Sequence, residues 1–305
     1  MRRILSILFL SFTILSLHSQ NTPNDAYKRH WEPGYERIRI MSYNIFNGFD
    51  WGKDTDRQTR FVQWIKNQDP EVLALQELCS FTETSLSALA RQWGHSYVAI
   101  VKVDGYPVGI TSKRPIQVVH KMQENCGHGL LHVRTYGYDI LVTHLNPSDT
   151  NKRRQEAATI VRYIKEHNLD KCLLMGDMNS HSPSDADYME THSTDLLLKY
   201  GGSTSSNLLH GMFDYSVIST FLSAPLIDVC RLFTEEQARI TFPTSILMNV
   251  SQHQHIHQKT GERLDYIFAT PSVMPSVVDA FIYNGTDNDY LSDHYPVAID
   301  ILTKP

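Results

Sequence analysis

The stretch Leu174-Met175-Gly176-Asp177-Met178-Asn179 ends a run of apolar residues in a glycine, a carboxylate and an amide. Such a run predicts a strand buried inside a sheet, and a carboxylate at the edge of a core costs free energy unless another group pairs with it. Residues two apart in an extended chain point to one side, so Asp177 and Asn179 should face the same place. Gly176 would let backbone pass close to that place.

Other apolar runs in the chain also end in groups able to do chemistry. They are IMSYN ending in Asn44, VLALQE ending in Glu77, ILVTH ending in His144, RLDYIF containing Asp265, and SDHYP containing Asp293 and His294. Taken singly, each group also has a structural interpretation, such as a turn asparagine, a solvated strand end or a buried hydrogen-bonded histidine. Because strands packed in sheets can bring several such ends together, their joint occurrence favours a functional site.

The chemistry of this set is that of phosphoester hydrolysis. An imidazole suits general-base work near neutral pH, and Asp265 could fix the tautomer of His294 and stabilise its protonated form. Glu77, with Asn44 and Asp293, offers hard oxygen ligands that suit Mg²⁺ better than a metal that prefers thiolates. The set therefore predicts metal-assisted attack of water on a phosphoester.

The remaining pattern predicts a protein with more strands than helices. Runs rich in Val, Ile and Tyr predict strands at 38–44, 72–76, 97–103, 108–112, 117–121, 130–135, 139–143, 172–175, 264–269 and 297–302. Helices are expected at 59–68, where Asp69-Pro70 would end the first, and at 151–167. The polar strand ends of both halves belong to one set, so we expect a single domain over residues 37–305.

The N-terminus predicts export. Two arginines, the apolar run from Ile4 to Leu17 and the small residues after it are typical of a signal peptide. We therefore expect residues 1–19 to be removed and residues 20–36 to form a mobile leader. The run of about 14 apolar residues is shorter than the roughly 20 that a spanning helix needs, so we expect no stable membrane anchor. Periplasm and extracellular medium both stay open as destinations.

Charge argues against a long nucleic-acid footprint. Removal of Arg2 and Arg3 would take the 28 basic residues to 26 against 33 acidic ones, a formal charge near −7. A protein that grips a long nucleic acid normally shows a basic stripe, and none is visible. The cluster Lys152-Arg153-Arg154 could approach a phosphate, although a solvated helix face is the favoured interpretation.

Two further sets of residues leave alternatives open. Cys79, Cys126, Cys172 and Cys230 form no CxxC pair and allow three full disulfide pairings, among which the sequence does not choose. Cys172 lies in an apolar run and is better interpreted as a core residue. The alternating His253, His255 and His257 could bind a transition metal on a strand, but a solvated loop is favoured.

Six motifs, in this order, closely resemble the motif set of the endonuclease/exonuclease/phosphatase superfamily. They are SYN (42–44), LQE (75–77), THL (143–145), GDMN (176–179), RLDYIF (263–268) and SDHYP (292–296). The resemblance extends from about residue 37 to 302 and is to exported bacterial-type members with a motif set similar to that of deoxyribonucleases and sphingomyelinases. Abasic-site endonucleases and inositol-polyphosphate phosphatases are also members. It implies an α+β fold, a four-layer αββα sandwich of two packed mixed sheets flanked by helices.

The resemblance also implies a role for each motif residue. Glu77 would be the principal Mg²⁺ ligand, Asn44 would orient ligands or phosphate, and Asp293 would contribute to the metal environment. Asp177 would orient or deprotonate the attacking water or assist the leaving group, and Asn179 would hold the phosphate.

Histidines complete the implied site. His294, braced by Asp265, would be the general base or would polarise the phosphate, and the choice between it and Asp177 as the base stays open. His144 would bind the phosphate or protonate the leaving group. His128, in CGHGLLHV (126–133), is a candidate for substrate binding, with an ordinary turn histidine as the alternative.

One departure from the resemblance is visible. Phe46 stands where many relatives carry a polar residue. Either Asn47 compensates for it, or the first metal shell is simpler here.

We therefore expect a secreted, Mg²⁺-dependent phosphoesterase acting on a small-molecule or lipid-derived phosphoester, with Mn²⁺ and Ca²⁺ as alternative ions. A secreted nuclease of the same fold, with nucleic acid as its partner, is the alternative. Two readings from other classes are a non-catalytic phosphate-binding protein and a plain adhesive β-rich domain. No obligatory protein partner is predicted, and no adjacent pair of large aromatic residues suggests a membrane-inserting hairpin.

Overall fold

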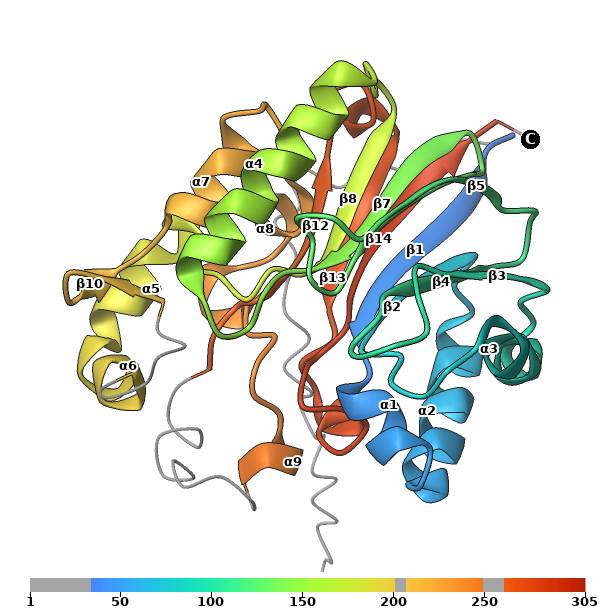
Figure 1. Cartoon of the computed structure of the whole chain (residues 1–305), viewed down its shortest axis with the longest axis horizontal. Coiled ribbons are helices and arrows are strands. Elements are labelled where there is room, and N and C mark those ends of the chain that lie inside the picture. The colour runs from blue at the N-terminus through green and yellow to red at the C-terminus, as the bar shows by residue number, and fades with distance from the viewer. Residues whose placement is uncertain (1–33, 201–206, 249–260, 305) are drawn as a thin grey trace, which may run out of the picture.

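Two six-stranded sheets pack face to face in the computed structural model, which describes residues 34–200, 207–248 and 261–304 (Figure 1). The predicted signal peptide, nearly all of the predicted leader and the cluster His253, His255 and His257 lie outside the described residues. The first strand starts at Glu36, one residue before the predicted start of the domain.

The first sheet has the order β13 (Val277–Ile282), β14 (Val297–Thr303), β1 (Glu36–Asn44), β2 (Val72–Gln76), β4 (Gly109–Ser112) and β3 (Tyr97–Ile100). The second has the order β11 (Ile227–Asp228), β12 (Asp265–Ala269), β8 (Cys172–Asp177), β7 (Tyr138–His144), β6 (Leu130–Thr135) and β5 (Gln117–Met122). The β1–β2 and β7–β8 pairs are parallel and the other pairs within these sheets are antiparallel. Each sheet is therefore mixed. A small ribbon pairs β9 (Leu208–Leu209) with β10 (Met212–Phe213).

Helices cover the outer face of each sheet (Figure 1). The first sheet carries α1 (Phe46–Trp51), α2 (Thr55–Gln68) and α3 (Glu83–Ala90), and the second carries α4 (Thr150–Glu166) and α7 (Ser216–Leu222). The remaining helices are α5 (Ala186–Thr191), α6 (Ser193–Tyr200), α8 (Val229–Phe233) and α9 (Ser245–Met248), and 3₁₀ turns occur at Arg91–Trp93, Pro183–Asp185, Glu236–Ala238, Met274–Ser276 and Thr286–Asn288. Within the described part of the chain, no helix has both the length and the hydropathy needed to cross a membrane.

Three apolar layers hold this arrangement together. Ile40 of β1 and Val142 of β7 belong to the layer between the sheets, Ile160 of α4 belongs to the layer outside the second sheet, and Phe61 of α2 to that outside the first. Full burial of such a side chain contributes roughly 1.5–3 kcal/mol relative to its exposed state. The predicted four-layer αββα sandwich is confirmed.

Most predicted elements are present with shifted ends. All ten predicted strands and both predicted helices occur, although the strand predicted over 97–103 ends at Ile100. The sequence patterns missed β13, because a register shift between Val277 and Asp279 breaks its alternation. Cys172 lies in the core as predicted, and all four cysteines are buried and free, so none of the three possible disulfide pairings is formed.

Arg57 of α2 binds two chain segments at one end of the first sheet, the segment that follows β1 and the segment that precedes β14. Its guanidinium donates to the carbonyl oxygens of Ile45 at 2.8 Å, Phe46 at 2.9 Å and Leu291 at 3.1 Å, and pairs with Asp54 at 3.1 Å. The side chain is buried. Each carbonyl would lose its partner if the guanidinium were removed.

Replacing Arg57 with alanine is expected to lower the free energy of unfolding by about 3 kcal/mol, because a buried polar group without a partner costs roughly 1–3 kcal/mol. Urea denaturation measures the change. Arg60→Ala on the exposed face of the same helix is the matched control and should change stability by less than about 0.5 kcal/mol. Equal losses in the two variants would contradict the bracing role of Arg57.

Candidate active site

The ends of three neighbouring strands place chemistry-bearing side chains in one row. In the second sheet, His144 at the end of β7 pairs in register with Asp177 at the end of β8, and Asp177 pairs with Asp265 at the start of β12. In the first sheet, Asn44 ends β1 and pairs with Gln76, the residue before Glu77. Strand register thus brings together residues that are far apart in the sequence.

Gly176 makes the close approach at the end of β8 possible. Its φ is +140°, and a Cβ atom there would overlap the carbonyl oxygen of Thr143 on the neighbouring strand. The sequence predicted close approach to the contents of the site, whereas the close neighbour is β7. The glycine therefore lets His144 and Asp177 reach the same level of the sheet.

His294 lies between two carboxylates. Its Nδ1 is 2.8 Å from Asp265 Oδ2, and its Nε2 is 3.6 Å from Asp177 Oδ2. Burial alone would lower the pKa of His294, but the carboxylates of Asp265, Asp177 and Asp293 reverse this effect and raise it well above its ordinary value. The carboxylates therefore favour the protonated form of the imidazole, and Asp265 fixes its orientation.

The surrounding carboxyl groups have raised pKa values. Burial is the main cause, and it raises the pKa of Asp265 to about 6 and that of Asp293 to about 7, while the positive charge of His294 partly opposes it. The pKa of Asp177 is raised for the same reason, although His294, Asn179 and Asn44 each lower it. In the isolated protein these groups are therefore less fully ionised than exposed carboxylates would be. A bound cation would favour their ionised forms.

Asn44 joins the two sheets at the site. Its side-chain amide donates to Glu77 Oε1 at 3.2 Å and to Asp177 Oδ2 at 3.1 Å, and its Oδ1 accepts from the backbone N–H of Phe46 at 3.0 Å. A completely buried amide with three partners is held in one orientation. Asn44 therefore sets the separation of the Glu77 and Asp177 carboxylates.

A left-handed turn follows Asn44. From Phe46 to Trp51, the backbone of α1 has φ between +51° and +59°, a conformation that costs a non-glycine residue roughly 1–2 kcal/mol. The turn aims the backbone N–H of Asn47 at Glu77 Oε2, 2.6 Å away. The backbone of Asn47, next to the apolar Phe46, therefore orients Glu77, and strain of this kind is typical of functional sites.

The histidines of the second sheet form a stack. The rings of His128 and His144 lie 4.6 Å apart and 21° from parallel, and Tyr106 packs edge-on against His128. Burial lowers the pKa of His144 to about 4 and that of His128 to about 3, so both rings are neutral at neutral pH. His144 Nε2 is 3.4 Å from Asp177 Oδ2, and its buried Nδ1 has no hydrogen-bond partner among the described residues.

Asn179 lies beside the same carboxylate. Its backbone N–H donates to Asp177 Oδ1 at 2.9 Å and its side-chain amide donates to the carbonyl oxygen of Leu145 at 3.0 Å. Its φ of +46° is in the left-handed region that asparagine tolerates better than most residues. The amide therefore links the ends of β7 and β8.

The donor atoms suit a hard divalent cation. Among the described residues, one group of metal-capable side chains has ligand atoms within 4.8 Å of one another, Asp177, Asp265 and His294. Within this group, Asp265 and His294 are hydrogen-bonded to each other. A protonated imidazole does not bind metal. Oxygen donors that fit Mg²⁺ are offered instead by Glu77 and its neighbours Asn44 and Asp293. Asn44 is hydrogen-bonded to Glu77, and the charge of Glu77 contributes to the raised pKa of Asp293.

Sequence patterns missed several residues that support the site. The Ser292 hydroxyl donates to the Asn44 carbonyl oxygen at 2.6 Å, and Phe242 packs 4.8 Å from the His294 ring. Arg57 and Glu156 bind loops that lie next to the predicted site residues. The position of Ser292 within SDHYP was the available signal. Nothing in the sequence distinguished Arg57 and Glu156 from charged residues on the solvent-exposed face of a helix.

The interpretation of Lys152-Arg153-Arg154 as a solvated helix face was wrong for two residues. Arg153 is buried because its guanidinium binds the carbonyl oxygen of Asn146 and the side chain of Asn207. Arg154 binds Asp214 at 2.7 Å. Lys152 alone of the three is exposed.

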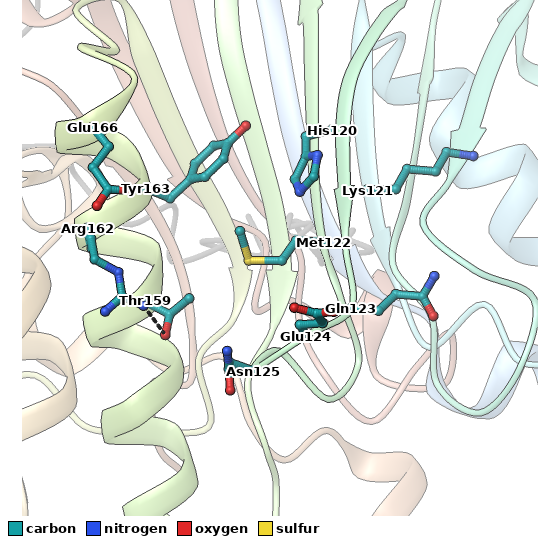
Figure 2. Close-up of a pocket in the computed structure, with 10 residues that line it drawn as sticks. All are labelled: His120, Lys121, Met122, Gln123, Glu124, Asn125, Thr159, Arg162, Tyr163 and Glu166. Carbon is teal, nitrogen blue, oxygen red and sulfur yellow. Dashed lines mark hydrogen bonds between the residues drawn. The ribbon is translucent and has the colours of Figure 1, made fainter.

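A cavity of about 530 Å³ lies away from these residues, between α4 and the edge strand β5 (Figure 2). Arg162 and Tyr163 line it from the helix, and His120 and Met122 line it from the strand. No residue of the predicted site contributes to its walls. The hydrogen-bonded cluster around His294, rather than this cavity, therefore holds the groups able to do chemistry.

Comparisons with known proteins bear on the family and the fold. A model of the Endonuclease/Exonuclease/phosphatase family matches residues 41–294. An AP endonuclease from Archaeoglobus fulgidus is similar in structure, with a TM-score of 0.61 and 18% sequence identity over 86% of this chain and 98% of that chain. The 3'-5' exonuclease NExo from Neisseria meningitidis has a TM-score of 0.61 and 16% identity over 87% and 99% of the two chains. The search of curated proteins found no match.

Proposed function

This chain belongs to the endonuclease/exonuclease/phosphatase family, whose members hydrolyse phosphoester bonds, and from that premise we propose that it is a divalent-metal-dependent phosphoesterase. The observation that carries the proposal is the His294 imidazole, fixed by Asp265 at 2.8 Å and facing Asp177, next to the Asn44 and Glu77 pair. Both the general base and the charge stabilisation that phosphoester hydrolysis needs are available there.

The roles follow from the charges. His294 carries a proton and stabilises the negative charge that develops on the phosphoryl oxygens, with Asp265 holding its orientation. Asp177 orients the attacking water and accepts its proton, because its carboxylate faces the Nε2 side of the His294 ring. Asn179 and the neutral His144 donate hydrogen bonds to the phosphate. This arrangement favours Asp177 over His294 as the base.

Glu77, Asn44 and Asp293 would hold the metal ion, and Mg²⁺ fits their oxygen donors. When bound, the ion supplies Lewis-acid stabilisation of phosphoryl oxygens. This chain's own part is to orient Glu77, through the N–H of Asn47 and the amide of Asn44.

The favoured substrate is a small-molecule or lipid-derived phosphoester. This preference is supported by the acidic composition of the chain and by the cluster Lys152-Arg153-Arg154, in which only Lys152 is exposed and available to a nucleic-acid backbone. A nuclease is the second candidate, because a similarly folded Neisseria 3' phosphatase is bound to a product DNA hairpin. We further propose that the protein is exported, on the strength of its N-terminal sequence.

Hydrolysis of a substrate panel tests the proposal. The mature protein is incubated with Mg²⁺ or EDTA and with DNA, RNA, sphingomyelin, phosphoinositides and inositol phosphates. Metal-dependent turnover of one class would support the proposal and identify the substrate. Metal-independent turnover, or none in folded protein that binds Mg²⁺, would contradict it.

The dependence of kcat/KM on pH should be bell-shaped. Activity falls on the acid side as Asp265 and Asp293, with pKa values of about 6 and 7, take up protons, and saturating Mg²⁺ should move this limb to lower pH because the cation competes with protons. On the alkaline side, activity falls as the pH rises through the raised pKa of His294.

Replacing Asp265 with asparagine should lower the alkaline pKa, because Asp265 is the foremost of the carboxylates that raise the pKa of His294. It should also lower kcat about 10²-fold or more through the lost orientation of the ring. Initial rates between pH 5 and 10 measure both effects. An unchanged alkaline limb would assign that limb to another group and refute this explanation.

A further inference from the structure

Glu156 is a buried carboxylate on α4 that binds two separate loops of the second sheet. Its Oε1 accepts the backbone N–H of Gly127 at 3.0 Å, and its Oε2 accepts the backbone N–H of Asn146 at 2.8 Å. The residue is only 4% exposed. Burying a carboxylate is unfavourable unless its oxygens are satisfied, and here each oxygen is used by a different loop.

Both loops carry a histidine of the site. Gly127 precedes His128, and Asn146 lies two residues after His144. The two rings stack at 4.6 Å, so their contact depends on the separation of the loops.

The loop around His128 needs an external restraint. His128 is flanked by Gly127 and Gly129, and glycine leaves the backbone free to adopt many conformations. Lys102 holds the Gly127 carbonyl oxygen at 2.7 Å, but it is a long side chain at the surface. Arg153 holds the other loop at the Asn146 carbonyl oxygen, 2.9 Å away. Glu156 is the group that binds both loops.

We propose that Glu156 is a positioning residue that fixes the stacked imidazoles of His128 and His144 over the catalytic carboxylates. The inference rests on the proposed function, because His144 acts on the phosphate within that site. Without the two hydrogen bonds the loops move apart, and the His144 ring loses its place 3.4 Å from Asp177. A misplacement of about 1 Å can lower a rate by about 10²-fold.

Two variants separate positioning from charge. Glu156→Ala removes both hydrogen bonds and should lower kcat about 50-fold, with KM changed less than about threefold. Glu156→Gln keeps one carbonyl oxygen and the size of the side chain, so it should retain one bond and lose about fivefold in kcat. If the negative charge itself were responsible, the two variants would lose activity equally, and that result would overturn the proposal.

Two control variants accompany them. Glu166→Ala removes an exposed carboxylate from the same helix and should keep the wild-type rate. Asp300→Asn disrupts the buried pair with Arg39, whose atoms lie 2.8 Å apart on β1 and β14, and should lower stability without lowering kcat. A kcat in Asp300→Asn as low as that of Glu156→Ala would show that lost stability explains the effect, and would overturn the proposal.

Hydrogen exchange gives a readout that does not depend on turnover. The amides of Gly127 and Asn146 should both exchange faster in Glu156→Ala than in the wild type. Faster exchange with unchanged kcat would refute the positioning role while leaving the proposed function intact. Absence of phosphoesterase activity in the wild-type protein would refute the proposed function and, with it, the catalytic role assigned to Glu156.

Discussion

Asp177→Asn should lower kcat about 10³-fold, with KM changed far less. The carboxylate accepts the proton of the attacking water and faces the charged ring of His294, and loss of proton transfer and of electrostatic stabilisation each costs about 10²-fold or more. Asparagine has nearly the same shape, so the hydrogen bond from the N–H of Asn179 can persist. Steady-state kinetics on the best substrate of the panel measures the loss.

Asp170→Asn provides the matched control, because Asp170 is exposed and lies just before β8, at the opposite end from Asp177. Its kcat should equal that of the wild type. Thermal unfolding of both variants should show an intact fold. A kcat for Asp177→Asn within tenfold of the wild-type value would remove Asp177 from the role of base.

Glu77→Gln should weaken Mg²⁺ binding about 10²-fold and lower kcat at limiting Mg²⁺ by a similar factor. The change removes the anionic donor. It also places an amide next to the N–H of Asn47, which in the wild-type protein donates to Glu77 Oε2 at 2.6 Å. Calorimetric titration with Mg²⁺ measures the affinity. Activity should partly return as the Mg²⁺ concentration is raised, since the defect lies in binding.

The opposite end of the same strand supplies the control. Glu71 precedes β2 and accepts a hydrogen bond from the backbone N–H of Arg39 at 2.7 Å, remote from the site. Glu71→Gln should therefore bind Mg²⁺ as the wild type does. If Glu77→Gln bound Mg²⁺ with wild-type affinity, the group Asp177, Asp265 and His294 would become the better candidate for the metal site.

The sequence predicted the residues that lie at strand ends better than those that hold them. Buried strands are recognisable from their apolar runs, and a polar residue at the end of such a run is conspicuous, so the row of His144, Asp177 and Asp265 could be anticipated. Arg57 and Glu156 could not, because a charged residue on an amphipathic helix looks the same whether it meets water or a loop. Only tertiary structure shows which carbonyl or amide group it meets.

Backbone conformation was also beyond the sequence patterns. Phe46 looked like a departure from a polar metal shell, and Asn47 like a side-chain replacement for it. In the structure, the left-handed turn instead directs the backbone N–H of Asn47 to the Glu77 carboxylate. No propensity favours left-handed geometry for phenylalanine, so tertiary contacts such as those of Arg57 with the carbonyl oxygens of Ile45 and Phe46 must impose it.

The central claim is that the cluster around His294 hydrolyses a phosphoester with the aid of a divalent cation. The most direct measurement compares wild-type protein with His294→Ala on one substrate of the panel, each with Mg²⁺ and with EDTA, while circular dichroism monitors folding. We predict turnover by the wild type in Mg²⁺ alone and a loss of about 10³-fold in folded His294→Ala. Turnover by His294→Ala at a near wild-type rate, or turnover by the wild type in EDTA, would contradict the account.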